Sequence, residues 1–132
     1  MMENKSIIME TVDYIESRLD DDECENLRLD EIANKISYSK FHLNRLFAEV
    51  VGCTIYKYIQ KRRLTEAAKK LVCTDKPIID IAYEALYESQ QAFTLAFKQL
   101  YTHTPQEYRT IGIYASKQNR FTAFGELSAN PI

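Results

Sequence analysis

TIYKYIQKRRLTEAAKKLVC, residues 54–73, is the stretch that decides the fold. Thr54 can cap a helix, and no proline or glycine interrupts the residues that follow it. Apolar residues recur there at helical spacing, which leaves the basic side chains for solvent or an anionic partner. Roughly 20 residues at a rise of about 1.5 Å each predict a single helix about 30 Å long.

The same pattern of residues occurs on both sides of this helix. Each member of the second copy lies 50 positions after its counterpart in the first. The first copy consists of Ser39, Leu43, Leu46, Phe47, Thr54 and Tyr58, and the second of Ser89, Phe93, Ala96, Phe97, Thr104 and Tyr108. This repeat predicts two copies of one helical unit with the long helix as a spacer. We interpret Tyr58 and Tyr108 as structural.

Each copy has the pattern of two helices joined by a short turn. In the first, apolar residues at helical spacing between positions 29 and 36 precede a helix that Ser39 caps and Gly52 ends. In the second, Pro77 is expected at the first position of a short helix, and Ser89 caps the next one. Two helices so closely joined, the second with a serine cap, indicate a helix-turn-helix.

The remaining segments complete an all-α prediction. Ser6 is expected to cap a first helix that ends near Asp20, and the acidic stretch 20–26 is expected to be a solvated connection. Thr104-Pro105-Gln106-Glu107 is a capping box that opens a last short helix. Residues 111–132 change in character, and three interpretations stay open: a short strand, a packing tail, or the beginning of a further segment.

The expected organisation is therefore two helix-turn-helix subdomains joined by a long central helix. Residues 1–53 hold an N-terminal helix and the first subdomain, and residues 54–73 form the linker helix. Residues 74–110 hold the second subdomain, and residues 111–132 form a C-terminal tail.

The distribution of charge points to a local anionic partner. The net charge is −2, but residues 1–39 carry −7, residues 40–70 carry +6, and residues 71–132 carry −1. A phosphate backbone is felt only over about a Debye length, roughly 8–10 Å, so the local block matters more than the total.

Several classes of protein and site are not expected. The chain has no apolar run long enough to span a membrane, and its charged N-terminus does not resemble a signal peptide, so we expect a cytoplasmic protein. Cys24, Cys53 and Cys73 are widely spaced and odd in number, which predicts free thiols and no metal site. No phosphate loop or catalytic triad is present, so we expect neither a cofactor nor an enzyme.

The faces opposite the apolar stripes suggest contact with nucleic acid. Arginine, asparagine and glutamine side chains match the edges of guanine and adenine in the major groove. One helical turn of duplex is about 34 Å, so a spacer of about 30 Å suits two recognition helices in successive major grooves. Arg45 is the strongest candidate, because it lies on a capped helix within the basic block.

At this point the sequence resembles the AraC/XylS family of bacterial transcription regulators. The resemblance runs from about Leu29 to Arg109 and rests on SYSKFHLNRLFAEVVG, YKYIQKRRLTEAAKKL and IIDIAYEALYESQQAFTLAFKQLYTHTPQEYR. The stretches YSKFHLNRLF and ESQQAFT are most similar to the stress and multidrug-resistance activators that bind DNA as monomers. The resemblance implies promoter DNA as the partner, activation through RNA polymerase, and a place on the nucleoid when bound.

The resemblance also assigns roles to residues. Those expected to contact bases are Phe41, Asn44, Arg45, Gln90, Gln91 and Thr94. Those expected to contact phosphates are Ser39, Lys40, Lys57, Lys61, Arg62, Ser89 and Lys98. Leu95 stands where the family usually has arginine, and Leu86 and Thr102 stand where it usually has glycine. Because all three departures lie in the second unit, we expect the first unit to dominate specificity.

Two alternatives remain beside a DNA-binding regulator. The acidic N-terminal third and the departures at Leu86 and Leu95 are also compatible with a helix-turn-helix module that binds another protein, or a co-regulator with weak DNA binding. Many family members carry a separate ligand-sensing domain. A chain without one is expected to be controlled by its abundance.

Overall fold

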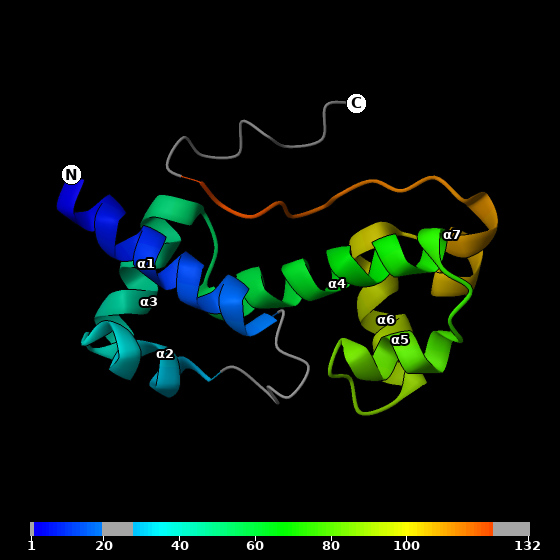
Figure 1. Ribbon diagram of the computed structural model, residues 1–132, viewed down its shortest axis with the longest axis horizontal. Coiled ribbons are helices and arrows are strands. Elements are labelled where there is room, and N and C mark those ends of the chain that lie inside the picture. Colours follow the sequence, from blue (N-terminus) through cyan, green and yellow to red (C-terminus); the bar gives the residue numbers. More distant parts are fainter. Residues whose placement is uncertain (1, 20–27, 123–132) are drawn as a thin grey trace. The chain divides into compact units, whose positions relative to one another are not determined.

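Helices dominate the computed structural model of the chain, which describes residues 2–19 and 28–122 (Figure 1). Within these residues the helices are α1 (Met2–Leu19), α2 (Leu29–Ile36), α3 (Lys40–Val51), α4 (Ile55–Cys73), α5 (Ile78–Glu84), α6 (Gln90–Tyr101) and α7 (Pro105–Ile111). They belong to two compact units, which share α4: its first six residues lie in unit 1 and the rest in unit 2. The predicted all-α class, with two helix-turn-helix subdomains joined by a long central helix, is confirmed.

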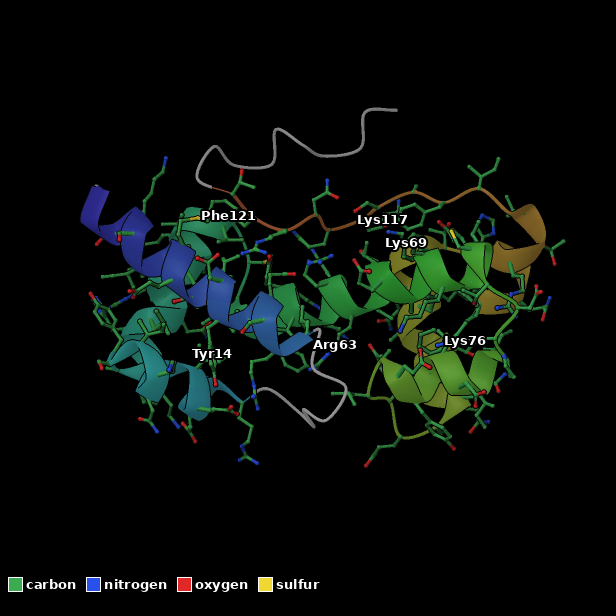
Figure 2. The ribbon with its side chains drawn as sticks, viewed as in Figure 1. Tyr14, Arg63, Lys69, Lys76, Lys117 and Phe121 are labelled. Atoms are coloured by element: carbon green, nitrogen blue, oxygen red, sulfur yellow. The ribbon has the colours of Figure 1, made fainter. Side chains whose placement is uncertain are left out.

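Unit 1 packs α1, α2, α3 and the beginning of α4 around one apolar core. The α1 side chains Ile8, Val12 and Ile15 are completely buried, four and three residues apart, as one face of a helix requires. Tyr14, labelled in Figure 2, donates a hydrogen bond of 2.8 Å to Glu31 and so ties α1 to α2. Both of these helices also contact α3.

Unit 2 packs the rest of α4 with α5, α6 and α7 around a core rich in aromatic rings. Phe97 of α6 lies between Tyr101, at a centroid distance of 4.7 Å, and Tyr108, at 5.4 Å. At its surface, Lys70 of α4 pairs with Glu84 of α5 at 2.8 Å. Hydrogen bonds from Lys70 and from Lys76 (Figure 2) lower the pKa of that carboxyl.

The sequence repeat is also a repeat of packing. In unit 1 the rings of Phe47 and Tyr58 meet edge to face at 5.5 Å, and in unit 2 those of Phe97 and Tyr108 do so at 5.4 Å. Both tyrosines are buried, so their structural interpretation is confirmed. The phenylalanine rings of α3 and α6 are therefore packed against equivalent tyrosines.

Most of the predicted helix ends are confirmed, and two are wrong. Side-chain caps are present at Ser39, Thr54, Ser89 and Thr104, the last in a complete capping box. Ser6, however, lies inside α1, which begins at Met2. Pro77 is the N-cap residue of α5, one position before the first helical residue. The predicted acidic connection at 20–26 lies outside the described residues.

Among the described residues, three other than glycine adopt left-handed backbone conformations, and two of these are the expected departures from the family. Thr102 ends α6 with φ 64°, where the equivalent residue at the end of α3 is Gly52 with φ 103°. Leu86 follows α5 with φ 67°, and Ser37 follows α2 with φ 65°. These are positions at which a β-carbon is unfavourable, so the family's usual glycine has a physical reason.

The segment that follows α7 is a packing segment as far as the structure describes it. Up to Asn119 it lies on unit 2, where the hydroxyl of Tyr101 donates to the Ala115 carbonyl and Thr65 accepts from the amide of Gln118. Residues 120–122 belong to unit 1, and Phe121 (Figure 2) is buried in that core. The rest of the predicted tail, residues 123–132, lies outside the described residues.

Among the described residues, no helix is both long enough and apolar enough to cross a lipid bilayer. The same residues contain no group of three or more histidine, cysteine, aspartate or glutamate side chains placed to hold a metal ion. Cys53 and Cys73 form no disulfide bond within the described residues, while Cys24 lies outside them.

Candidate nucleic-acid interface

The sequence of α3 leaves one face of that helix exposed. Ser39 accepts a hydrogen bond from the amide of His42 and begins the helix, while Leu43, Leu46 and Phe47 turn into the core of unit 1. The opposite face then points to solvent because helical positions repeat about every 3.6 residues. Phe41 lies on that face with 78% of its surface exposed.

Arg45 is the clearest candidate for contact with DNA in unit 1. Its side chain is exposed and makes no hydrogen bond or ion pair with any residue that the structure describes. It follows Phe41 by four residues, so the guanidinium and the ring are neighbours on the helix surface. A planar fork of donors beside an apolar ring can bond a guanine edge and cover a thymine methyl group.

Asn44, which was predicted to contact a base, has a partner inside the protein. It is half-buried, and its Oδ1 accepts a hydrogen bond of 3.0 Å from the amide of Ile55, the first residue of α4. That amide has no partner within its own helix. The corresponding pair in unit 2 is Thr94 and Pro105, and proline has no N–H to satisfy. The Asn44 side chain therefore joins α3 to the beginning of α4.

The basic side chains predicted to contact phosphates differ in how available they are. Lys57 and Lys98 are exposed, and Lys61 is half-buried. Lys40 is exposed but pairs with Asp30 at 2.9 Å, and its hydrogen bond lowers the pKa of that carboxyl. A phosphate at Lys40 would therefore have to compete with a carboxylate of α2.

Arg62 is the prediction that the structure supports least. Its side chain is only 11% exposed, and its guanidinium donates to Glu66 and to the carbonyl of Gln118, both at 3.2 Å. The basic pattern of α4 could not reveal this, because Gln118 lies 56 residues away in an extended segment. Arg62 fastens that segment to α4, and little of its side chain is exposed for contact with a phosphate.

In unit 2, α6 presents a face of different chemistry. Ser89 is half-buried and caps the helix by accepting from the amide of Ala92 at 3.0 Å, and Phe93 and Phe97 fill the core. Gln90 and Gln91 are exposed in the first turn. Thr94 is half-buried, so of the predicted base-contacting residues of α6 it is the least accessible.

Sequence reasoning treated Leu95 only as a lost arginine, but the structure places it in the middle of the exposed face of α6. It is 65% exposed. Tyr56, at the beginning of α4 and beside Lys57, was not among the predicted site residues, yet it is 74% exposed. The sequence could have indicated the position of Leu95, because it follows Gln91 by four residues and so lies on the same face of the helix.

Comparison with known proteins identifies the family. A family model described as a helix-turn-helix domain matches residues 32–111. The regulatory protein SoxS of Salmonella typhimurium is 38% identical over 108 residues, which cover 82% of this chain and 97% of SoxS. The chain belongs to the AraC/XylS family. The family prediction made from the sequence is thus confirmed.

Two further relatives show how much of each protein the similarity covers. The transcriptional regulator Rob of Salmonella typhimurium is 40% identical over 124 residues, or 94% of this chain and 39% of Rob. The chain therefore spans about two-fifths of the length of this relative. A crystal structure of an AraC-type transcriptional regulator from Chromobacterium violaceum superposes with a TM-score of 0.73 and 26% identity, covering 83% of this chain and 95% of that one.

Proposed function

We propose that the chain is a sequence-specific, double-stranded DNA-binding transcription regulator. In this proposal α3 and α6 are the recognition helices and enter successive major grooves, with α4 as the spacer. Membership of a family whose curated relatives are named as regulators supports it. No covalent chemistry or cofactor is required, because recognition rests on hydrogen bonds, apolar contacts and neutralised phosphates.

The observation that carries the proposal is the exposed face of α3. Arg45 is a cation with no partner among the described residues, and Phe41 beside it exposes 78% of its surface. Neither side chain contributes to the core of unit 1. Exposed large apolar groups beside an available cation are typical of a binding surface. Arginine can bond a guanine edge, and an aromatic ring can cover a thymine methyl group.

The finer parts of the proposal concern assembly. We infer that the chain binds an asymmetric promoter site as a monomer, because its two recognition helices are different in sequence and each unit supplies one. We also infer activation through contact with RNA polymerase, as the family resemblance implies. Phosphates would be contacted by the exposed Lys57 and Lys98 and by the half-buried Lys61. The amide-rich N-termini of α3 and α6 would add backbone donors.

Selection of duplexes from a random pool tests the proposal. The expected product is a long asymmetric site with two boxes about one helical turn, roughly 10 base pairs, apart. Binding to it should weaken steeply as salt rises, since released counterions supply much of the affinity. A pool that yields no enriched sequence, together with binding that does not depend on salt, would refute the proposal. A single enriched box would restrict recognition to one unit.

A second candidate is a module that binds another protein. The observation that favours it is the outer face of α5, where Ile79 is 41% and Tyr83 52% exposed, four residues apart. Leu86, in the following turn, is 39% exposed. The salt dependence of binding to random duplex separates the candidates, because a pure protein adaptor should bind such DNA hardly at all.

A further inference from the structure

A leucine occupies the centre of the exposed face of α6. Leu95 is 65% exposed and does not belong to the core that the described residues of unit 2 form around Phe93 and Phe97. It lies four residues after Gln91 and three before Lys98, and both of these side chains are exposed. Because residues three or four apart are neighbours on a helix, α6 presents an amide, a branched alkyl group and a cation in a row.

The repeat places Leu95 in a position of known orientation. Its counterpart 50 residues earlier is Arg45, and the counterpart of Gln91 is Phe41. Both helices are capped by a serine, and both bury two equivalent positions, Leu43 and Phe47 on α3 and Phe93 and Phe97 on α6. Leu95 is therefore aimed as Arg45 is, away from the core of its own unit. The aromatic ring and cation of α3 are replaced on α6 by an amide followed by an alkyl group.

The chemistry of Leu95 selects the base that it can face. Leucine has no donor or acceptor, so a guanine or cytosine edge opposite it would lose water without gaining a hydrogen bond. Thymine is the one base that presents an apolar group, its C5 methyl, in the major groove. Gln91, one turn earlier, can form two hydrogen bonds with an adenine.

We propose that Leu95 is a specificity-determining residue that contacts the methyl group of a thymine, so that the second box of the site contains A·T base pairs. This inference rests on the proposed function, since it requires α6 to enter a major groove. On this inference, leucine in place of the family's arginine changes which base the second unit recognises and does not simply weaken its binding to DNA. Loss of one buried methyl group corresponds to about a fourfold loss of affinity.

Removal of that methyl group from the DNA tests the inference directly. The probe is the duplex recovered by selection, with each thymine of the second box replaced in turn by deoxyuridine, which keeps the pairing and hydrogen-bonding edges. Wild-type protein should bind about fourfold more weakly at one position. The Leu95→Ala variant should bind thymine and deoxyuridine duplexes equally there, whereas Leu95→Met, which keeps an alkyl side chain, should retain the difference.

Deoxyuridine in the first box is the matched control. It should affect wild-type protein and Leu95→Ala alike, because α3 lies in the other unit. Two results would overturn the inference while leaving DNA binding intact: no thymine of the second box responds, or the response is unchanged in Leu95→Ala. Absence of any enriched, salt-dependent binding would instead overturn the proposed function, and the inference with it.

Discussion

Asn44 and Arg45 are adjacent on α3 but should fail in different ways when each is replaced by alanine. The hydrogen bond from the Ile55 amide to Asn44 predicts a loss of stability. Arg45, which is exposed and has no partner among the described residues, predicts a loss of DNA binding without a loss of stability. Both side chains were predicted to contact bases, so this pair of variants separates a positioning role from a recognition role.

The size of each effect follows from the structure. Ile55 is 2% exposed, so its amide has little access to water once Asn44 is shortened. An unsatisfied buried donor costs about 1–3 kcal/mol, and the higher helix propensity of alanine returns about 0.5 kcal/mol. Asn44→Ala should therefore destabilise by about 0.5–2.5 kcal/mol. Arg45→Ala should change stability by less than about 0.5 kcal/mol but weaken specific binding by about 1–3 kcal/mol.

Urea denaturation followed by far-ultraviolet circular dichroism measures the first quantity, and fluorescence anisotropy with a labelled duplex at fixed salt measures the second. Thr94→Ala is the matched control for stability, because the residue opposite Thr94 in unit 2 is Pro105, which has no amide hydrogen. Asn44→Asp keeps an acceptor at the beginning of α4, where the helix dipole favours a carboxylate, and should retain stability.

A positioning role for Asn44 is refuted if Asn44→Ala is as stable as wild type and loses affinity as Arg45→Ala does. Asn44 would then read a base, and its contact with Ile55 would be incidental. A loss of stability as large in Thr94→Ala as in Asn44→Ala would also refute it. That outcome would attribute the effect to any shortening on a recognition helix.

Other predictions concern stability. Thr102 has a φ of 64°, which glycine adopts without strain, so Thr102→Gly should raise the free energy of unfolding by about 0.5–1 kcal/mol. The control Thr110→Gly, inside α7, should lower it. The thermal midpoints of the two variants measure both effects. The pKa of Glu107 is lowered mainly by the amide of its N-cap residue, so its stabilisation exists above the unfolded-state pKa and is lost as pH falls through the folded-state value. Glu107→Gln should flatten that part of an acid titration followed by circular dichroism. Phe121→Ala leaves a cavity at a buried site and should lower the free energy of unfolding, measured by urea denaturation, by about 3 kcal/mol. Ile113 is 71% exposed, so Ile113→Ala should change that free energy hardly at all.

The helices could be predicted from the sequence because their signals are local. The caps at Ser39, Ser89 and Thr104 lie within three residues of the amides that they accept from. The beginning of α1 was misplaced for the same reason: a serine is tolerated inside a helix, and Ser6 carries no mark that distinguishes it from a cap. Local chemistry predicts that a helix exists better than where it begins.

The candidate site could be predicted only in part, because some of its side chains have distant partners. Asn44 and Ile55 lie on different helices, and the turn at residues 52–54 brings them into contact. Arg62 and the extended segment after α7 meet across 56 residues of sequence. That segment is held by the hydroxyl groups of tyrosine and threonine side chains on helices, including Tyr58, which accepts from the Phe121 amide. An extended segment without periodicity gives no sequence signal for such contacts.

Contacts with phosphates and contact with the thymine methyl group are expected to respond differently to salt. Affinity that comes from cations on phosphates falls as counterions become abundant, and the exposed cations proposed for such contacts are Lys57 in unit 1 and Lys98 in unit 2. Contact between Leu95 and a thymine methyl group has no counterion term, because it depends on apolar area removed from water. As salt rises, total affinity should therefore fall while the penalty for removing that methyl group stays constant. A recognition helix without its arginine is then compatible with a regulator that discriminates between sites in concentrated salt.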